Sequence, residues 1–111
     1  MIARIWRASA TPEGADGYER HFTGAVLPSL RGVAGHRGAY LLRRDADGRV
    51  EIEVMTLWDS MDAIRRFAGD DPATAVVEPA ARAVLLGYDA TVTHHQVAHH
   101  PGAGSDGDPR P

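Results

Sequence analysis

The sequence of 111 residues contains no cysteine, no lysine and no asparagine. Without cysteine, the chain can have no thiol nucleophile, disulfide, cysteine-ligated zinc or iron–sulfur cluster. Because all twelve basic residues are arginine, Schiff-base catalysis and lysine-bound pyridoxal phosphate are excluded as well. Any chemistry therefore comes from histidine, arginine, tyrosine, tryptophan, acidic and hydroxyl side chains, backbone groups or the substrate itself.

Several larger signatures are also absent. The chain has no P-loop and no G-x-S-x-G motif, so nucleotide-triphosphate and serine-hydrolase chemistry lack their signatures. No apolar run approaches the ~18–20 residues of a membrane span. The net charge of −3 offers little attraction to nucleic acid or anionic lipid. Since residues 1–7 are typical of a strand and not of a signal peptide, we expect a cytoplasmic protein with neither a nucleic-acid nor a membrane partner.

The length allows one hydrophobic core, and the chain begins with a predicted strand and helix. Alternation over residues 2–9 indicates the first strand. Thr11-Pro12-Glu13 has the capping hydroxyl, the proline and the acid of a helix start. We expect this helix over residues 12–28, closed by Pro28 and Gly32. Its apolar stripe consists of Tyr18, Phe22 and Val26.

A hairpin follows, and its second strand has two different faces. The turn Asp45-Ala46-Asp47-Gly48 joins a predicted strand over residues 39–44 to one over residues 50–58. One face of the later strand is apolar and carries Val50, Ile52, Val54 and Trp58. The other face changes along the strand from Glu51 and Glu53 to Met55 and Leu57. A half-apolar face is unusual for a solvated surface, so we expect part of it to be covered.

The remaining chain predicts a second helix, short helical segments and a last strand. Asp59-Ser60 caps a helix whose apolar side chains are Met61, Ile64 and Phe67. Residues 73–87 predict short helical segments that Pro79 interrupts and Gly87 ends. The last strand is expected over about residues 88–97. From residue 99 onward the chain is rich in proline, glycine and aspartate, which predicts a disordered tail.

This order of elements is β-α-β-β-α-β, which predicts an α+β fold, the ferredoxin-like sandwich of one antiparallel sheet and two helices. Helices on a single face leave the other face of the sheet bare. Two such sheets stacked face to face would cover each other in a two-fold symmetric dimer. The half-apolar strand face supports this expectation of a homodimer.

Three segments resemble the antibiotic biosynthesis monooxygenase (ABM) family. They are Met1-Ile2-Ala3-Arg4-Ile5-Trp6-Arg7, Gly35-His36-Arg37-Gly38-Ala39-Tyr40-Leu41-Leu42-Arg43-Arg44 and Thr56-Leu57-Trp58-Asp59-Ser60-Met61-Asp62-Ala63-Ile64. The resemblance covers about residues 1–98, with residues 99–111 left as a tail. Leu57-Trp58-Asp59-Ser60 before a helix is its most specific part. The resemblance implies a dimeric α/β barrel.

Function transfers less directly than fold. Proteins that resemble this family include cofactor-independent monooxygenases of polyketide phenols, haem-degrading enzymes and non-redox cyclases or isomerases. The quinone-forming oxygenases use a pocket asparagine, which this chain lacks entirely. The haem-degrading branch has an axial histidine after its tryptophan, and residues 60–87 contain none. The departures disfavour haem degradation and leave the usual oxygenase set incomplete.

The resemblance and the residue types together indicate three catalytic candidates: Trp58, His95 and His21. Trp58 matches the family's pocket tryptophan and would stack on a planar substrate, although a core anchor is an equal alternative. His95 matches a histidine common in the last strand of similar proteins and could take a phenolic or enolic proton. Because adjacent strand residues point to opposite faces, only one of His94 and His95 can enter the pocket.

The substrate-binding candidates are Trp6, Tyr40, Phe22, Phe67 and Arg4. The aromatic side chains are expected to wall the pocket, and Arg4 could pair with a substrate oxyanion. We expect no metal site, because the histidines at 94–95 cannot converge from one strand and those at 99–100 fall in the predicted tail.

The sequence thus predicts a cofactor-independent monooxygenase that acts on a small aromatic or polyketide-like phenol or enol. Two alternatives stay open: a non-redox cyclase, isomerase or lyase that uses His95 or His21 as a proton shuttle, and a ligand-binding protein without catalysis.

Overall fold

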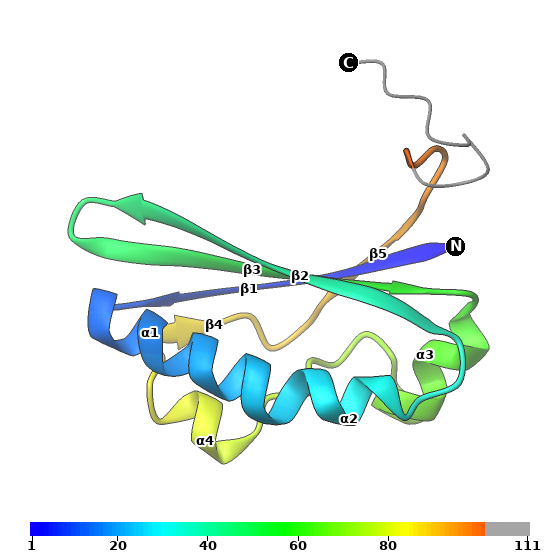
Figure 1. The fold of residues 1–111 in the computed structure, drawn as a ribbon, viewed down its shortest axis with the longest axis horizontal. Helices are drawn as coiled ribbons and strands as arrows, with labels where there is room; N and C mark the ends of the chain where they lie inside the picture. The colour runs from blue at the N-terminus through cyan, green and yellow to red at the C-terminus, as the bar shows by residue number, and fades with distance from the viewer. Residues whose placement is uncertain (102–111) are drawn as a thin grey trace.

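A computed structural model describes residues 1–101 of the chain and shows one sheet with helices on one side (Figure 1). The strands are β1 (Ile2–Ala10), β2 (His36–Ala46), β3 (Arg49–Trp58), β4 (Gly87–Tyr88) and β5 (Thr93–Gln96). The helices are α1 (Pro12–His21), α2 (Leu27–Arg31), α3 (Met61–Ala68) and α4 (Pro79–Arg82), with a π-helical turn, Phe22–Val26, between α1 and α2.

The sheet is antiparallel and runs in the order β2-β3-β1-β4, with β5 also paired to β1. The predicted α+β ferredoxin-like fold is confirmed, and the strand predicted over residues 88–97 is present in two pieces. Both pieces lie along the same edge of β1. The hairpin prediction is also confirmed: Asp47 and Gly48, both with positive φ, form a two-residue turn between β2 and β3.

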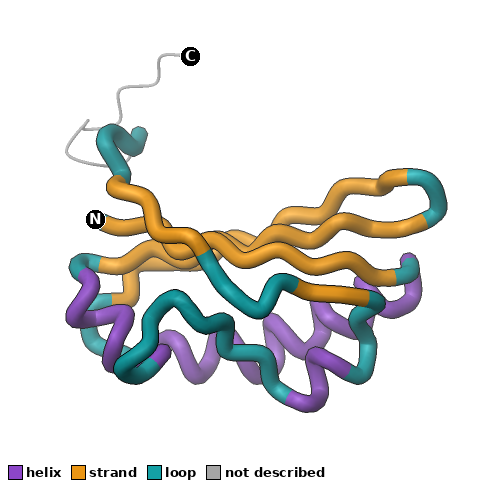
Figure 2. The backbone as a smooth tube through the Cα atoms, turned by 180° about the vertical axis from the view of Figure 1, so that it is seen from behind, coloured by secondary structure: helices purple, strands orange, loops and turns teal. Residues whose placement is uncertain are grey.

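Residues 90–92, between β4 and β5, pair with another segment instead of β1. The backbone N–H of Ala75 donates to the carbonyl of Ala90 over 2.9 Å, and that of Val92 donates to the carbonyl of Ala73 over 2.9 Å. Residues 73–75, which follow α3, thus pair with residues 90–92. Figure 2 shows this irregular chain on the helix side of the sheet.

The first helix is longer than its sequence predicts. It starts as expected, with the Thr11 hydroxyl accepting the Gly14 N–H over 2.9 Å and Pro12 in the first turn. It does not end at Pro28, which was expected to close it, but continues to Arg31. A π-helical turn, in which Leu27 N–H donates to the Phe22 carbonyl, precedes the proline. This wider turn accommodates the proline that an unbroken α-helix would reject.

Residues 73–87 also differ from expectation. They contain one short helix, α4, which Pro79 begins instead of interrupting, since a proline fits the first helical turn. Gly87 belongs to β4 and does not end a helix. Residues 69–78 therefore form an irregular segment beside the sheet, and this segment supplies one wall of the site described below.

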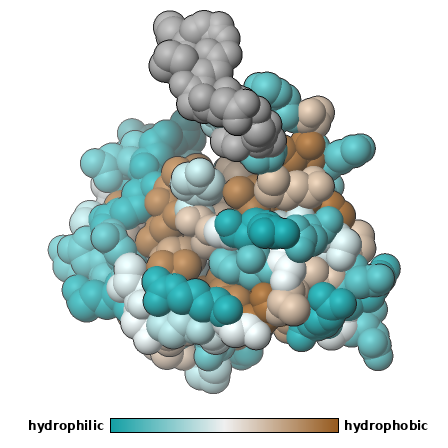
Figure 3. Space-filling model, turned by 45° about the vertical axis from the view of Figure 1, so that its right-hand side comes forward, coloured by the Kyte–Doolittle hydropathy of each residue, from teal (hydrophilic) through white to brown (hydrophobic). Residues whose placement is uncertain are grey.

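The two faces of the sheet have opposite surroundings. On β3 the even-numbered side chains from Val50 to Trp58 are buried beneath the helices, as their alternation predicts. The other face has no helix over it (Figure 1) and exposes Tyr40 and Leu42 of β2. These faces are called the helix face and the open face from here on. In Figure 3, which brings the N-terminal end of the sheet forward, apolar patches alternate with hydrophilic side chains.

No helix among residues 1–101 is long and apolar enough to cross a membrane. Most of the tail predicted to be disordered, residues 102–111, lies outside the described residues.

Candidate functional site

A small cavity of about 70 Å³ lies between the helix face of the sheet and the helices. Its volume is enough for about two water molecules, so a ligand with an aromatic ring would enter only if the wall moves outward. Most of its wall is apolar, with aromatic side chains from three elements. The lining residues are Arg4, Trp6, Tyr18, His21, Val26, Ser29, Leu30, Val54, Thr56, Phe67, Val76, Val77, Glu78 and Ala81.

Arg4, on β1, lines this cavity with a charged side chain, and it is only 4% exposed. Its guanidinium donates to the carbonyls of Pro72 and Thr74, the latter over 3.0 Å, and lies 3.1 Å from Nε2 of His94. It also lies over the Phe67 ring, 5.8 Å from the ring centre. Burial lowers the pKa of Arg4, yet a guanidinium remains charged in proteins. The cavity therefore has a fixed positive charge at its wall.

His94, and not His95, is the histidine of β5 that faces the helix side. Its register partner is Arg4, and burial, followed by the charges of Arg4 and His95, lowers its pKa. Neutral His94 accepts the Arg4 N–H at Nε2, which places its proton on Nδ1. Two consequences follow for this pair: His94 carries no charge near neutral pH, and it helps to fix the position of the guanidinium.

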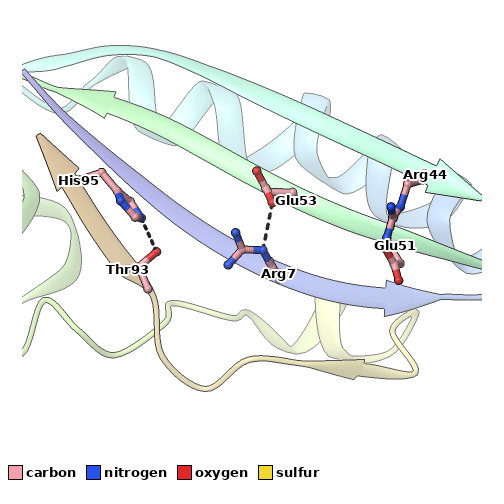
Figure 4. Close-up of polar contacts among 6 residues, drawn as sticks. All are labelled: Arg7, Arg44, Glu51, Glu53, Thr93 and His95. Carbon is pink, nitrogen blue, oxygen red and sulfur yellow. Dashed lines mark hydrogen bonds and ion pairs between the residues drawn. The ribbon is translucent and has the colours of Figure 1, made fainter. Parts of the chain in front are cut away.

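His95, the sequence candidate, lies on the open face because its strand neighbour takes the other side. Figure 4 shows its ring turned toward Thr93, whose hydroxyl is 2.9 Å from Nε2, on the same face as the Arg7–Glu53 pair. The expectation that His95 serves the pocket is therefore corrected: on this chain, it is not the histidine of β5 that reaches toward the cavity.

His21 lies in the cavity wall at the C-terminal end of α1, with its side chain 12% exposed. Its Nε2 is 3.5 Å from Oε1 of Glu78, which belongs to the irregular segment after α3. Tyr18, one helical turn earlier, is buried in the same wall, and its ring is 6.0 Å from the His21 ring. Burial, with a smaller contribution from Glu78, raises the pKa of Tyr18 to about 12. Tyr18 can donate a hydrogen bond but cannot act as a base at neutral pH.

Trp58 lies behind the cavity wall and is 0% exposed. Its ring stacks on Phe67 at 5.6 Å, and its indole N–H donates to the Thr56 hydroxyl over 2.8 Å. The edge of His36 packs against it at 5.0 Å, and burial lowers the pKa of His36. Direct stacking of Trp58 on a substrate, expected from the sequence, is not possible in this arrangement. Trp58 reaches the cavity only through Phe67 and Thr56, both of which line it.

The remaining candidates divide between the cavity, the core and the open face. Trp6, Phe67, Arg4 and His21 line the cavity. Phe22 is buried in the core between α1 and the sheet and is not part of the wall. Tyr40 was expected to wall the pocket, but it is 56% exposed on the open face, since it pairs with Met55 in the β2–β3 register. The alternation of β2 places Leu41, not Tyr40, on the helix face.

Sequence reasoning missed Tyr18, Thr56 and Glu78 as cavity residues. Thr56 could have been found, because it lies two positions before Trp58 and therefore on the same face of β3. Tyr18 was assigned only to the apolar stripe of the helix. Glu78 had no signal, because the irregular segment that contains it shows no periodicity.

A second depression, of about 740 Å³, lies on the open face. Four of its charged side chains form two ion pairs: Arg7 Nε is 3.0 Å from Glu53 Oε1, and Arg44 Nε donates to Glu51 over 2.9 Å (Figure 4). Because these charged groups are exposed to water, their interactions are weak. The smaller, more enclosed cavity on the helix face is therefore the better candidate site.

The cavity does not fit a haem group in its present form. Neither a porphyrin nor a fused-ring phenol fits a space of about 70 Å³ unless the wall moves outward, so the donor groups and not the volume decide this point. Three lining residues, His21, Tyr18 and Glu78, are of types that can ligate iron. Nε2 of His21 already faces Glu78, and the pKa of Tyr18, raised to about 12, disfavours the phenolate that iron binds. No group of three histidine, cysteine or acidic side chains within residues 1–101 is arranged to hold a metal ion.

Comparisons with known proteins agree with this fold. The model of the antibiotic biosynthesis monooxygenase family matches residues 1–79. A monooxygenase from the gene ActVA-Orf6 of Streptomyces coelicolor, solved with the ligand nanaomycin D, has a TM-score of 0.62 and 20% identity, over 90% of this chain and 91% of its own. The haem-degrader MhuD of Mycobacterium tuberculosis, solved with two haems in its active site, has a TM-score of 0.60 and 23% identity, over 90% of this chain and 98% of its own. At such identities the likeness shows the fold alone. No curated protein matches the chain.

Proposed function

Because the chain belongs to the antibiotic biosynthesis monooxygenase family, we propose that it is a monooxygenase of secondary metabolism that oxidises a phenolic or enolic, polyketide-type substrate without a cofactor. One observation carries this proposal: His21 is held beside the Glu78 carboxylate in the wall of a mostly apolar, aromatic cavity. A histidine in such a place can take the acidic proton of a phenol or enol.

The substrate supplies the redox chemistry in this proposal. Its deprotonated, electron-rich ring gives one electron to O₂, and the carbon radical and superoxide so formed combine into a hydroperoxide. Loss of water from the hydroperoxide leaves a carbonyl. One oxygen atom of O₂ thus enters the product. The other leaves as water with two hydrogens: the hydroxyl proton, which the base returns to the peroxide, and the hydrogen of the carbon that is oxidised. The protein has to take a proton, hold the anion and exclude water.

Each of these tasks has a candidate residue in the cavity wall. His21 takes the proton, and Glu78 stabilises the imidazolium that results. The Arg4 guanidinium faces the developing oxyanion. Trp6 and Phe67 pack against the faces of the substrate ring. His95 has no part in this scheme, since it lies on the open face.

Oxygen uptake by the purified apoprotein tests the proposal. Hydroxylated naphthalenes and anthrones serve as substrates, with O₂ consumption and product formation measured together. We expect one O₂ consumed per carbonyl formed, no turnover under strict anaerobiosis, and a loss of about 10²–10⁴-fold in kcat for His21→Gln. Arg20→Gln, a change of an exposed neighbour on the same helix, serves as the control and should retain activity. Turnover that continues unchanged without O₂ would exclude the oxygenase.

A non-redox cyclase or isomerase is the second candidate. Tyr18, with its pKa raised to about 12, is a hydrogen-bond donor in the same wall as the His21 base. A donor beside a base is what keto–enol proton transfer requires. Anaerobic turnover that falls with both His21→Gln and Tyr18→Phe would favour this candidate. If no change in the cavity alters any rate, while a ligand raises the melting temperature, the protein is a binding protein.

We propose further that two copies pair through their open faces. Tyr40 and Leu42 are exposed there, beside the less exposed Met55 and Leu57 of β3. A second sheet would remove these side chains from water. Sedimentation velocity tests this: Leu42→Asp should shift a dimer to monomer, whereas a monomeric wild-type protein would overturn the proposal.

A further inference from the structure

Arg4 is the one buried side chain among residues 1–101 that carries a charge, and no carboxylate pairs with it. Its protein partners are two backbone carbonyls and a histidine. The carbonyls contribute partial negative charge only, and His94 is neutral near neutral pH because its pKa is lowered. The positive charge is therefore enclosed in the protein without a counter-ion, an arrangement that is costly when no anion is present.

Acidic side chains lie nearby in the chain but do not neutralise Arg4. Asp71 directly precedes Pro72, whose carbonyl Arg4 binds, yet its carboxylate accepts the Thr74 hydroxyl over 2.7 Å. Glu78, in the same cavity wall, faces His21. If Arg4 served only to hold residues 72–74 against the sheet, a neutral donor could make the same bonds at lower cost.

The guanidinium also has N–H groups that donate to no group within residues 1–101. Its Nη1 faces Pro72 and His94, and its Nη2 donates to Thr74. Its Nε–H makes no hydrogen bond with any part of the chain that the structure describes, although Arg4 lines the cavity. A flat aromatic ring, Phe67, lies under the guanidinium. An anionic oxygen in the cavity would thus find both a charge and free N–H donors.

We propose that Arg4 is an anion-binding residue, and that the cavity takes a conjugated oxyanion: an aromatic carboxylate, phenolate or enolate bound in its charged form. This inference rests on the proposed function, since it concerns the same cavity, and it names the charge of the ligand. His94 is a positioning residue. Its Nε2 accepts a hydrogen bond from Arg4 Nη1 and so helps to hold the guanidinium in place, without neutralising its charge.

Binding of small probes tests the charge preference. Benzoate and its neutral isostere benzamide are titrated against the protein, with tryptophan fluorescence as the readout because Trp6 lines the cavity. Benzoate should bind about 10–100-fold more tightly than benzamide, as a charged hydrogen-bonded partner requires. With 4-nitrophenol, the bound ligand should show the absorbance of the coloured phenolate at a pH where the free phenol is mostly neutral. Equal affinity for benzoate and benzamide, or no binding of benzoate, would overturn the proposal.

A pair of adjacent substitutions tests the role of Arg4 in that preference. His94→Asp places a carboxylate against the guanidinium, so it should abolish the preference for benzoate without lowering the melting temperature. His95→Asp adds the same charge one residue away, on the open face, and should leave the preference intact. If both variants lose benzoate equally, or if His94→Asp keeps it, Arg4 is not the anion-binding residue. Neither titration needs O₂ or turnover, so a missing oxygenase reaction would leave this result standing.

Discussion

The helix face and the open face of one sheet carry the same side-chain types in opposite electrostatic surroundings. Arg4 and Arg7 are three positions apart on β1. Arg7 is exposed and has Glu53 at 3.0 Å, whereas Arg4 is buried and has no carboxylate. His94 and His95 divide in the same way on β5. The two arginines thus differ in how their charge is balanced. Arg7 has a carboxylate partner on the open face, which a second chain could cover, whereas Arg4 has none on the face that contains the cavity.

The largest expected difference between the faces concerns their aromatic side chains. Trp58→Ala should lower the free energy of unfolding by about 3–5 kcal/mol, because it removes a fully buried ring stacked on Phe67. Tyr40→Ala, on the open face, should change it by less than about 1 kcal/mol. Urea denaturation of both variants at low protein concentration measures this. Similar losses for the two would contradict the contrast.

The two arginines provide the next comparison. Arg4→Gln should reduce kcat/KM about 10–100-fold, because a neutral donor replaces a charged one at the oxyanion. Arg7→Gln should leave kcat/KM unchanged, since its ion pair with Glu53 is exposed and weak. Steady-state kinetics on the substrate found by oxygen uptake gives both values. A dependence on Arg7 as large as that on Arg4 would place the reaction on the open face.

The fold was largely predictable because its signals are local. Alternation separated the buried and open faces of β3, the Asp47-Gly48 turn fixed the hairpin, and Thr11 and Ser60 cap their helices as expected. The errors have tertiary causes. The π-helical turn lets the first helix continue through Pro28, and pairing with residues 73–75 draws residues 90–92 off the sheet edge.

The candidate site was less predictable, because it depends on face and on distant pairing. The alternation of side chains along a strand predicts that His94 and His95 lie on opposite faces of the sheet. Which of them faces the helices depends on the register of β5 with β1. In the same way, the register of β2 with β3 places Tyr40 on the open face. The Glu78 partner of His21 comes from a segment without periodicity, so no sequence pattern could bring the two together.

Two threonines extend the comparison to single hydroxyl groups. Thr56→Val should cost about 1–3 kcal/mol, since it leaves the Trp58 indole N–H buried without an acceptor. Thr93→Val, on the open face, should stay within about 0.5 kcal/mol, since the His95 ring that it contacts is exposed and can bind water. Thermal and urea unfolding of both variants checks this. A neutral Thr56→Val would mean that Trp58 finds another acceptor.

The smallest expected effect is the pH dependence of stability that His94 contributes. The pKa of His94 in the folded protein is lowered from the ordinary 6.5, first by burial and then by Arg4 and His95. The unfolded chain therefore binds more protons than the folded one as pH falls below about 6.5. The stability that neutral His94 provides is present above that pH and is lost toward the lower folded pKa, with a slope of at most about 1.4 kcal/mol per pH unit.

His94→Gln should reduce this slope between pH 6.5 and the acidic range where carboxylates begin to titrate, because glutamine can still accept from Arg4 but does not ionise. The slope should not vanish, since the lowered pKa of His36 acts with the same sign. His95→Gln, one position away on the open face, should leave the slope nearly as it is. Urea midpoints measured across this pH range separate the two variants. If His95→Gln flattens the profile and His94→Gln does not, the two histidines have been assigned to the wrong faces, and the anion site at Arg4 loses its neutral partner.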